Sequence, residues 1–378
     1  MNKNNIDIII VGGGLGGLLS SVLLSEISGL QVVLLEAGND YEDRRLLKAD
    51  TRHTLEGIGG AGTLGGGKLC GRPSSSKLWS KTCRSLGQYA DFLSFLDLPH
   101  SAIETLKNRN YSQLHLGRLQ HKQYGSYLLN EGQMMQFVLN MRERAILAGV
   151  DLKPNSRVDE IKRNNTNYEV LVNNDWISAK KVIFATGRSG SLSLKKLLGD
   201  FPIRFNEQSP DLGIRITTPK YSTDAFIENG DDVKYKLNTK HHSVRTFCVC
   251  TGGSVTPVSF ENSTYFDGHF GSTLTDSVNL GVMSREAGLV GTNAALQYCQ
   301  LLSKNGLPQI PLSDLHAYIN LLKKRSNMTP FNAVFDSLIY FVDELHNRGA
   351  LKLNNSDSKV FFPAIDRYWP RVTTDEYF

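Results

Sequence analysis

The sequence predicts an α/β fold, and three observations in its 378 residues support this class. The first is a buried strand over Ile6–Val11 that runs into a glycine turn and an apolar helix. The second is an apolar strand over residues 31–36 that ends on a carboxylate. The third is a later apolar strand, residues 181–184, that is followed by Ala-Thr-Gly. Strands that alternate with helices in this way favour a parallel sheet covered by helices.

The glycine turn has the spacing G-x-G-x-x-G, formed by Gly12, Gly14 and Gly17. The first glycine allows the tight turn, the second lets the backbone approach a pyrophosphate, and the third lets helix and strand pack closely. The helix N-terminus then presents its free N–H groups to the phosphates. Glu36 follows about 20 residues on, where such folds place the acid that binds the ribose hydroxyls, and an acid there disfavours NADP. We therefore expect a dinucleotide site.

A different interpretation of residues 6–24, as a signal peptide or a membrane span, is disfavoured. The run carries Asp7, lacks a cationic n-region and shows no small-residue cleavage pattern. No later stretch offers ~20 uninterrupted apolar residues. We expect a soluble, cytoplasmic protein.

The composition is that of an ordinary globular protein, with 40% hydrophobic and 21% charged residues. The length allows two domains. The net charge of +5 is scattered along the chain, so a nucleic-acid partner is not expected. Five cysteines without a C-x-x-C pair predict reduced thiols rather than a disulfide framework or a metal site.

Two features after Glu36 extend the predicted site. Arg44 and Arg45 either contact the adenine or the phosphates of the ligand, or they belong to solvated surface. Seven glycines then fall between Gly57 and Leu69 in a second loop, and glycine lets the backbone come close to a ligand. The alternative for this loop is a disordered surface segment. Its candidate ligand contacts are Gly60, Gly62, Thr63, Gly67 and Lys68.

Further elements follow in order. Helices are predicted over residues 76–96 and 131–148, and in the second helix Met134, Val138, Met141 and Ala145 form one stripe. A short strand follows from Val150. Three short strands then lead to the return strand at 181–184, and they cover residues 157–163, 168–172 and 176–178.

This order of elements resembles the layout of FAD-binding domains of the glutathione-reductase type, a Rossmann-like α/β fold. A plain NAD-binding Rossmann domain is expected to continue with alternating helices and strands. The resemblance implies that the backbone around Val158 touches the adenine. It also implies that Ala185, Thr186 and Gly187 close over the cofactor. Arg188 and Ser189 are expected to cap the turn that follows.

The composition changes near residue 191 towards polar, β-rich segments. We expect an FAD-binding domain over residues 1–190, with inserted helices at about 70–130. A β-rich substrate domain is expected over 191–355, and a return towards the FAD-binding domain over 356–378. Within the second domain, strands are predicted at 211–217 and 244–255, and helices at 312–323 and 331–345.

Several segments are similar to a bacterial family of uncharacterised FAD-dependent dehydrogenases. They are residues 59–69, 212–216, 245–253, 283–296 and 361–368, and the segment F-C-x-C-x-G-G is the most specific. Gly65 and Gly66 depart from the polar pair expected there, and Thr251 stands where proline is usual. In such proteins the chain continues past the last motif into a strand and a turn that binds the flavin. The resemblance thus implies a protein partner that supplies this part, a fragment of a longer ancestor, or weakened flavin binding.

Three residues are the candidates for catalysis. Cys248 and Cys250 alternate with Val249, so on a strand both thiols point to one face. They form either a redox pair, or a nucleophile and acid beside the flavin, or two small buried hydrophobes. A disulfide between positions i and i+2 would be strained. Lys68 either stabilises the reduced flavin or contacts a phosphate.

These features predict an FAD-dependent oxidoreductase, a dehydrogenase in which the flavin carries the redox step. Its organic substrate would be held between the two domains. The alternatives are a flavin monooxygenase or tRNA-modifying flavoprotein, and a non-catalytic or split-enzyme subunit whose flavin site a partner completes. No second G-x-G-x-x-G follows a strand, so a tightly bound NAD(P)H domain is not expected.

Overall fold

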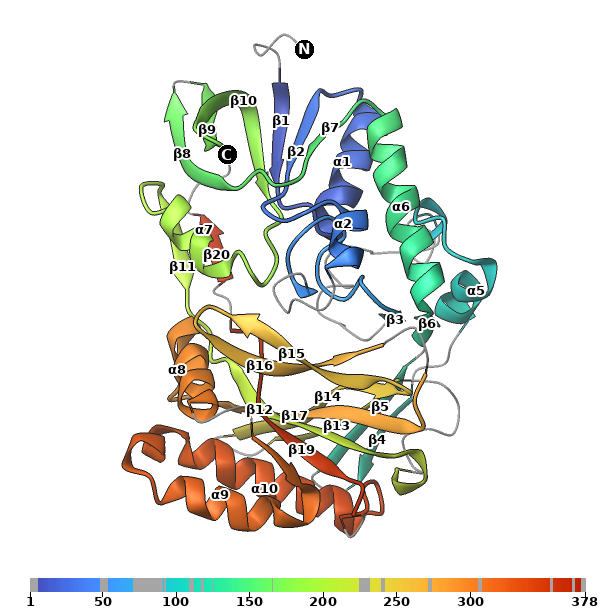
Figure 1. The fold of residues 1–378 in the computed structure, drawn as a ribbon, viewed down its shortest axis with the longest axis vertical. Coiled ribbons are helices and arrows are strands. Elements are labelled where there is room, and N and C mark those ends of the chain that lie inside the picture. Colours follow the sequence, from blue (N-terminus) through green and yellow to red (C-terminus); the bar gives the residue numbers. More distant parts are fainter. Residues whose placement is uncertain are drawn as a thin grey trace. The chain divides into compact units, whose positions relative to one another are not determined.

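The chain folds into two units in a computed structural model, and each unit is described by itself (Figure 1). Unit 1 comprises residues 1–65, 131–206 and 369–378, and unit 2 comprises residues 66–130 and 207–368. The structure describes residues 6–47, 54–70, 91, 93–108, 112–116, 119–124, 126–164, 166–223, 232–238, 242–270, 274–304, 308–353, 356–368 and 371–374.

Unit 1 is built on a six-stranded sheet in the order β7-β2-β1-β10-β9-β8. The four strands β7, β2, β1 and β10 are parallel to one another, and β9 and β8 continue the sheet as antiparallel strands. The strands of the sheet are β1 (Ile6–Val11), β2 (Val32–Leu35), β7 (Asp151–Lys153), β8 (Val158–Asn164), β9 (Asn167–Val172) and β10 (Asp175–Phe184). The mixed α/β class predicted from the sequence is therefore observed.

The helices of unit 1 follow the sequence pattern. They are α1 (Leu15–Ser28), α2 (Tyr41–Leu46), α6 (Glu131–Leu147) and α7 (Ser191–Leu197). The predicted stripe of α6 is buried together with Phe137, and α1 and α6 pack against each other beside the parallel strands (Figure 1). Gly29 ends α1 with a left-handed φ of 63° and donates its N–H to Ser25, as a glycine C-cap does. A two-stranded ribbon, β11 (Ile203–Asn206) with β20 (Arg371–Thr374), completes the described part of the unit.

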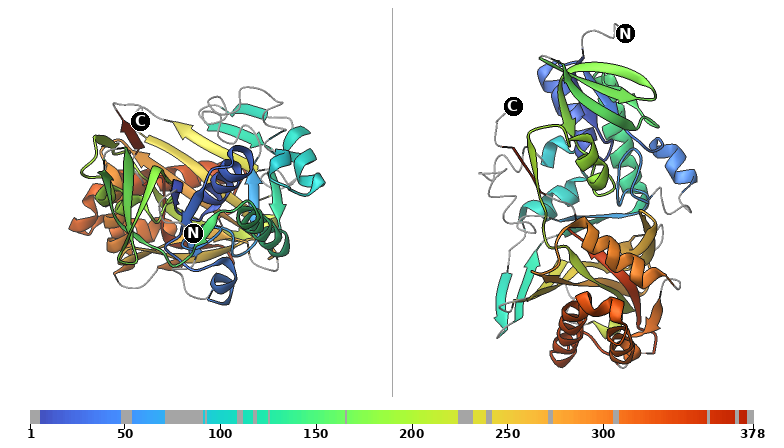
Figure 2. Two further views of the ribbon diagram at one scale, coloured as in Figure 1. Left: turned by 90° about the horizontal axis from the view of Figure 1, so that it is seen from above. Right: turned by 90° about the vertical axis from the view of Figure 1, so that its left-hand side faces the viewer.

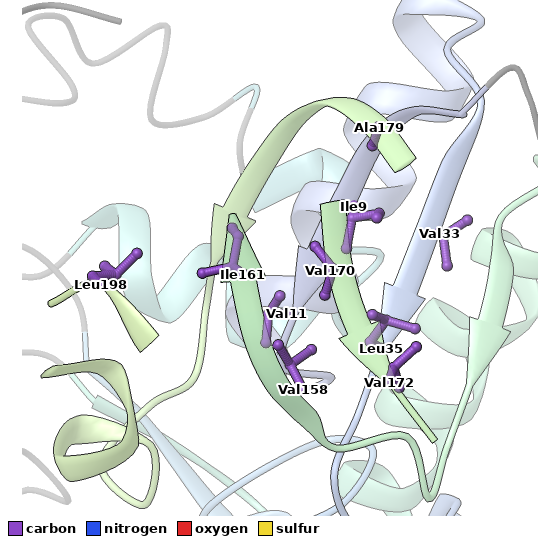
Figure 3. Close-up of a cluster of buried hydrophobic side chains, with 10 residues drawn as sticks. All are labelled: Ile9, Val11, Val33, Leu35, Val158, Ile161, Val170, Val172, Ala179 and Leu198. Carbon is purple, nitrogen blue, oxygen red and sulfur yellow. The ribbon is translucent and has the colours of Figure 1, made fainter. Parts of the chain in front are cut away.

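The core of unit 1 lies between the parallel strands of the sheet and its antiparallel strands β8 and β9 (Figure 3). Alternate residues of β1 and β2 point to this face, because successive side chains of a strand point to opposite faces. Ile9 and Leu35, at the centre, are fully or almost fully buried. They pack with apolar side chains of β8, β9 and β10, namely Val158, Ile161, Val170, Val172 and Ala179, and with Leu198, which follows α7 directly.

The return strand differs from the prediction. Residues 176–178 and 181–184 are expected as two strands, but β10 is one continuous strand. Its first half pairs antiparallel with β9 and its second half pairs parallel with β1. The charges at Lys180 and Lys181 do not break it, because Lys180 is at the surface and binds Asp7 at 2.7 Å.

Unit 2 is built on an eight-stranded antiparallel sheet in the order β18-β19-β12-β17-β14-β13-β5-β4. Helices α9 and α10 lie along one face of this sheet, and the ribbon β15–β16 packs on the other (Figure 1). The helix pair and the sheet are also seen from the side in Figure 2. The strands of the sheet are β4 (Ser112–Leu116), β5 (Leu119–Tyr124), β12 (Asp211–Pro219), β13 (Asp232–Asn238), β14 (His242–Thr251), β17 (Ser277–Glu286), β18 (Gln309–Pro311) and β19 (Lys359–Asp366).

The other elements of unit 2 are short or lie outside this sheet. They are β3 (Gly67–Cys70), α5 (His100–Asn108), β6 (Ser126–Leu129), β15 (Ser254–Phe260), β16 (Ser263–His269), α8 (Gly291–Ser303), α9 (Leu315–Lys323) and α10 (Asn332–Asn347). The predicted strands at 211–217 and 244–255 correspond to β12, and to β14 with the start of β15. The two predicted C-terminal helices correspond to α9 and α10.

The division of the chain differs from the expected domains at residues 66–130. These residues are expected as helices inserted into the first domain, but they belong to unit 2 and contain four of its strands. The reason is strand pairing, since β5 pairs along its length with β13 and Gly66 forms a bridge with Phe270. Most of the helix predicted over 76–96 lies outside the described residues. None of the described helices is long and apolar enough to cross a membrane.

The position of Ile9 at the centre of the unit 1 core gives a stability prediction. We expect Ile9→Ala to lower the free energy of unfolding by about 2–5 kcal/mol, because it removes buried methylenes and leaves a cavity. Leu147→Ala is the matched control, since Leu147 is 79% exposed on α6. Urea denaturation of both variants measures the difference. Equal losses in the two variants would contradict the proposed core.

Candidate functional site

Unit 1 contains a cavity of about 380 Å³ at the carboxyl ends of its parallel strands. Open α/β sheets bind their ligands in this place. The walls come from the ends of β1, β2 and β10, from the start of β8 and from two glycine-rich loops. Eight of the predicted cofactor residues line it, namely Gly12, Gly14, Glu36, Gly60, Val158, Ala185, Thr186 and Gly187.

The first glycine turn is held closely from both sides. Gly12 has a φ of 109°, and a Cβ atom on it would lie 2.4 Å from the carbonyl oxygen of Ala185. A Cβ atom on Gly17 would lie 1.8 Å from the carbonyl oxygen of Gly12, so the helix packs directly on the turn. Gly14 differs, because its Cβ would meet only the Cα of Gly60 at 3.7 Å. The second glycine of the motif therefore faces open space at the cavity wall.

The Glu36 carboxylate joins the two glycine loops. Its Oε2 accepts from the backbone N–H of Gly13 at 2.6 Å. Its Oε1 accepts from Gly38 at 2.8 Å and from Gly57 at 2.9 Å. Carboxylate oxygens offer about four acceptor positions, and three are used here. Glu36 is only 7% exposed but lines the cavity, so it combines a structural tie with one acceptor position for a ligand hydroxyl.

The second loop approaches the first through its backbone. Gly59 donates its N–H to the carbonyl of Gly13 at 2.9 Å and forms a parallel bridge with Gly14. Gly60 has a left-handed φ of 73°, and a Cβ on it would lie 2.8 Å from the Cα of Gly14. The two loops therefore place bare backbone side by side at the cavity wall.

Arg44 supports the second loop from within the protein. It is fully buried, and its guanidinium donates to the carbonyls of Ile58 and Gly60. Burial lowers the pKa of Arg44 to about 10. Thr63 is also buried and donates its hydroxyl to the carbonyl of Gly60 at 2.9 Å. Both side chains thus shape the loop without lining the cavity.

Other predicted contacts also lie outside the cavity wall. Arg45 is exposed on α2, and Gly62 is exposed at the tip of the second loop with a φ of 79°. Gly17 packs behind the turn. Gly67 and Lys68 are in strand β3 of unit 2, where they pair with β6, because the glycine-rich segment ends in a strand rather than in a loop.

The segment that follows strand β10 contributes more residues to the cavity wall than the predicted Ala185, Thr186 and Gly187. Ala185 donates its N–H to the carbonyl of Val11 at 2.8 Å, which ties the end of β10 to the end of β1. Arg188 and Ser189, expected only as capping residues, line the cavity, as does Arg157. Arg188 and Ser189 lie four and five residues after the end of β10, and Arg157 lies four residues after the end of β7. This closeness to strand ends was the available signal in the sequence, since carboxyl ends of parallel strands meet at one edge of a sheet.

A second candidate site lies in unit 2 and brings together the three residues predicted for catalysis. The Sγ atoms of Cys248 and Cys250 are 3.4 Å apart, and Lys68 donates from its Nζ to the carbonyl of Val249 at 2.7 Å. In a regular strand, positions i and i+2 are about 6.6 Å apart. Here β14 has a register shift between Phe247 and Cys250, and Cys248 has a φ of 45°, so the two thiols turn towards each other.

The side chains around the thiols separate their pKa values. The hydrogen bond from Cys250 lowers the pKa of the Cys248 thiol well below its usual range, and the charges of Lys68 and Arg215 act in the same direction. The same bond, together with burial, raises the pKa of Cys250. The arrangement therefore favours a thiolate at Cys248 and a neutral thiol at Cys250, rather than two equivalent buried thiols.

Arg215 was not predicted as a site residue. It is fully buried and donates to the carbonyl of Cys248 at 2.7 Å and, from Nε, to Asn279 at 2.9 Å. Its Nη1 is 3.4 Å from the carboxylate of Asp267. The signal in the sequence was a single charged residue inside the apolar segment L-G-I-R-I, since an unpaired buried charge is costly.

No protein-family model and no curated protein sequence matches the chain. Solved structures with some likeness include CtdE in complex with FAD, at 15% identity over 97% of this chain and 74% of CtdE, with a TM-score of 0.37. They also include the Diels-Alderase PyrE3 of pyrroindomycin biosynthesis, at 13% identity over 79% of this chain, with a TM-score of 0.35. This chain covers 51% of PyrE3.

A further similar structure is NikD, an unusual amino acid oxidase of nikkomycin biosynthesis, at 14% identity over 74% of this chain and 70% of NikD. Its TM-score is 0.37. At identities and TM-scores this low, these likenesses carry no argument for function.

The two neighbouring helix glycines give a matched test of the first turn. We expect Gly17→Ala to lower the free energy of unfolding by about 1–3 kcal/mol or more, because its methyl group would overlap the carbonyl of Gly12. Gly16→Ala has open space around its methyl and is expected to raise stability by up to about 1 kcal/mol through helix propensity. Urea denaturation compares the variants, and equal stability would argue against the close contact.

The buried guanidinium of unit 2 gives a second stability prediction. Arg215→Met is expected to cost about 3 kcal/mol or more, because it leaves the buried acceptors of Cys248 and Asn279 without a donor. Arg348→Met, at an exposed i,i+4 pair with Glu344, is the control and is expected to change stability by less than about 0.5 kcal/mol. A thermal or urea melt that shows similar small effects would contradict the role of Arg215.

Proposed function

We propose that this protein is an FAD-dependent oxidoreductase whose unit 1 binds the adenosine and pyrophosphate part of FAD. The observation that carries the proposal is the cavity wall made by two glycine loops and Glu36. Open backbone at Gly14 and Gly60 leaves space where a pyrophosphate approaches, and a larger side chain at Gly60 would meet Gly14. The residues present therefore fit this group.

FAD is favoured over NAD by the strands that follow. After α6 and β7, the chain forms the antiparallel pair β8–β9 beside β10 instead of further alternating helices and strands. This is the order that resembles FAD-binding domains of the glutathione-reductase type. Val158, at the start of β8, lines the cavity, as expected for a contact with the adenine.

The chain's own residues would divide the work of holding the cofactor. The N-terminus of α1, capped by the backbone of Gly14, faces the cavity with its positive dipole end and favours the pyrophosphate. Glu36 would accept from a ribose hydroxyl. Arg157 and Arg188 add cationic groups to a wall that also holds Glu36 and Glu56. FAD, when bound, supplies the two-electron redox chemistry.

Binding experiments with the purified chain test this proposal. FAD is expected to bind with quenching of its fluorescence, and ADP is expected to displace it, because the adenosine part occupies the cavity. FMN lacks that part and is expected not to displace it. Tighter binding of NAD than of FAD, or no binding of any adenine nucleotide, would overturn the proposal.

A variant at Gly14 separates binding from folding. Gly14→Ala is expected to weaken FAD binding at least about tenfold, or 1.4 kcal/mol, because the methyl group projects where the pyrophosphate approaches. Its stability should change little, since the methyl meets only one atom at 3.7 Å. Gly199→Ala, outside the cavity and with ordinary contacts at 3.5 Å, is the control. Unchanged FAD affinity in Gly14→Ala would contradict the placement of the pyrophosphate.

A further inference from the structure

The thiol pair of unit 2 is built on strained backbone. Cys248 has a left-handed φ of 45°, which residues other than glycine seldom adopt. Such conformations persist where the surrounding structure holds them, and they gather at functional sites. Here two cations hold the carbonyls of the two bulged residues, since Arg215 binds the carbonyl of Cys248 and Lys68 binds that of Val249.

The surroundings of the pair are cationic. The groups that face it are Lys68 from β3, Arg215 from β12 and Asp267 from β16. Arg215 Nη2 is 3.5 Å from the Sγ of Cys250, and Asp267 is the opposing negative charge, 3.4 Å from Arg215. The positive charges of Lys68 and Arg215 favour a thiolate at Cys248, and thiolate character decides cysteine reactivity.

The two thiols differ in access as well as in charge. Cys250 is fully buried, whereas Cys248 is partly exposed. A partly exposed thiolate with a second thiol at 3.4 Å is the arrangement of an attacking cysteine and a resolving cysteine. Cys299, which is also buried, has a raised pKa because of burial and serves as an inert thiol for comparison.

We propose that Cys248 and Cys250 form a dithiol centre that reduces small hydroperoxides, with Cys248 as the attacking thiolate and Cys250 as the resolving thiol. The Cys248 sulfur attacks the peroxide, a sulfur–oxygen bond forms and the oxygen–oxygen bond breaks. The sulfur is oxidised by two electrons, and the alkoxide or hydroxide that leaves takes up a proton to give an alcohol or water. The product is a sulfenic acid on Cys248.

In the second step the Cys250 thiol gives up its proton and its sulfur attacks the sulfenic sulfur. The sulfur–sulfur bond forms, the sulfur–oxygen bond breaks, and the hydroxyl leaves with that proton as water. The sum is two thiols and one hydroperoxide giving one disulfide, one alcohol or water, and one further water. The ring closed between positions i and i+2 is strained, so this disulfide is expected to be easily reduced. The site lies within unit 2, so the proposal is independent of FAD binding.

The pH dependence of alkylation tests the thiolate without any mutation. The intact protein is treated with iodoacetamide across a pH series, and each cysteine is followed by peptide mass spectrometry. Cys248 is expected to react with a midpoint at or below about pH 7.5, one unit under the roughly 8.5 of an ordinary thiol. Cys299 is expected to stay unmodified. A midpoint for Cys248 above about 7.5 overturns the proposal.

Hydrogen peroxide tests the two steps. One equivalent is expected to convert the peptide that carries both cysteines to the form with two hydrogens fewer, and dithiothreitol is expected to reverse this. Cys250→Ser should stop at the sulfenic acid, trapped on Cys248 by dimedone, and Cys248→Ser should give no adduct at position 250. Oxidation of the partly exposed Cys70 before this pair, or trapping on Cys250 instead of Cys248, overturns the assignment.

Lys68 is a positioning residue in this scheme, and its variants separate charge from packing. Lys68→Met is expected to raise the alkylation midpoint of Cys248 by about one unit, whereas Lys68→Arg keeps the cation and is expected to leave it near the wild-type value. A purely structural role would move both variants together. Equal midpoints in Lys68→Met and wild type would remove Lys68 from the site.

Discussion

The candidate site of unit 1 depends on three hydrogen bonds, which the buried carboxylate of Glu36 accepts from backbone N–H groups. Glu36 stands at the end of β2, and its donors are Gly13 in the first glycine turn, Gly38 just after the strand, and Gly57 in the second loop. A buried carboxylate is tolerated only when it is well hydrogen-bonded. This requirement draws the two loops together, so the acid that lines the cavity also holds its two glycine loops in place.

A buried arginine binds backbone carbonyls at the candidate site of each unit. Arg44 donates to carbonyls of the second glycine loop, and Arg215 donates to the carbonyl of Cys248 at the bulge of β14. Both side chains are fully buried. In each case a guanidinium, with five donors in a fixed planar arrangement, satisfies carbonyls of irregular backbone that no helix or sheet would satisfy. The two candidate sites thus rest on irregular segments that are held from inside.

Local patterns predicted single elements well. The stripe of α6, the strands β1, β2 and β12, and the helices α9 and α10 follow from periodicity and from turn residues. Pairing between distant segments was not predictable in the same way. Strands β4 and β5 extend the sheet of unit 2 because β5 pairs with β13, more than 100 residues later. Strand β10 continues through two lysines because its first half pairs with β9 and its second half with β1.

The sequence by itself determined the glycine turn, the acid after β2 and the alternation of two cysteines on one strand, because each depends on residues close together in the chain. The bulge in β14 that brings the two thiols to 3.4 Å was decided by the tertiary structure. Tertiary structure alone decided which side chains meet these groups. It placed Arg44 beneath the loop rather than at the cavity, and brought Lys68 and Arg215 to the cysteines. The physical reason is that burial and charge contacts form across long chain separations, where residue spacing carries no information.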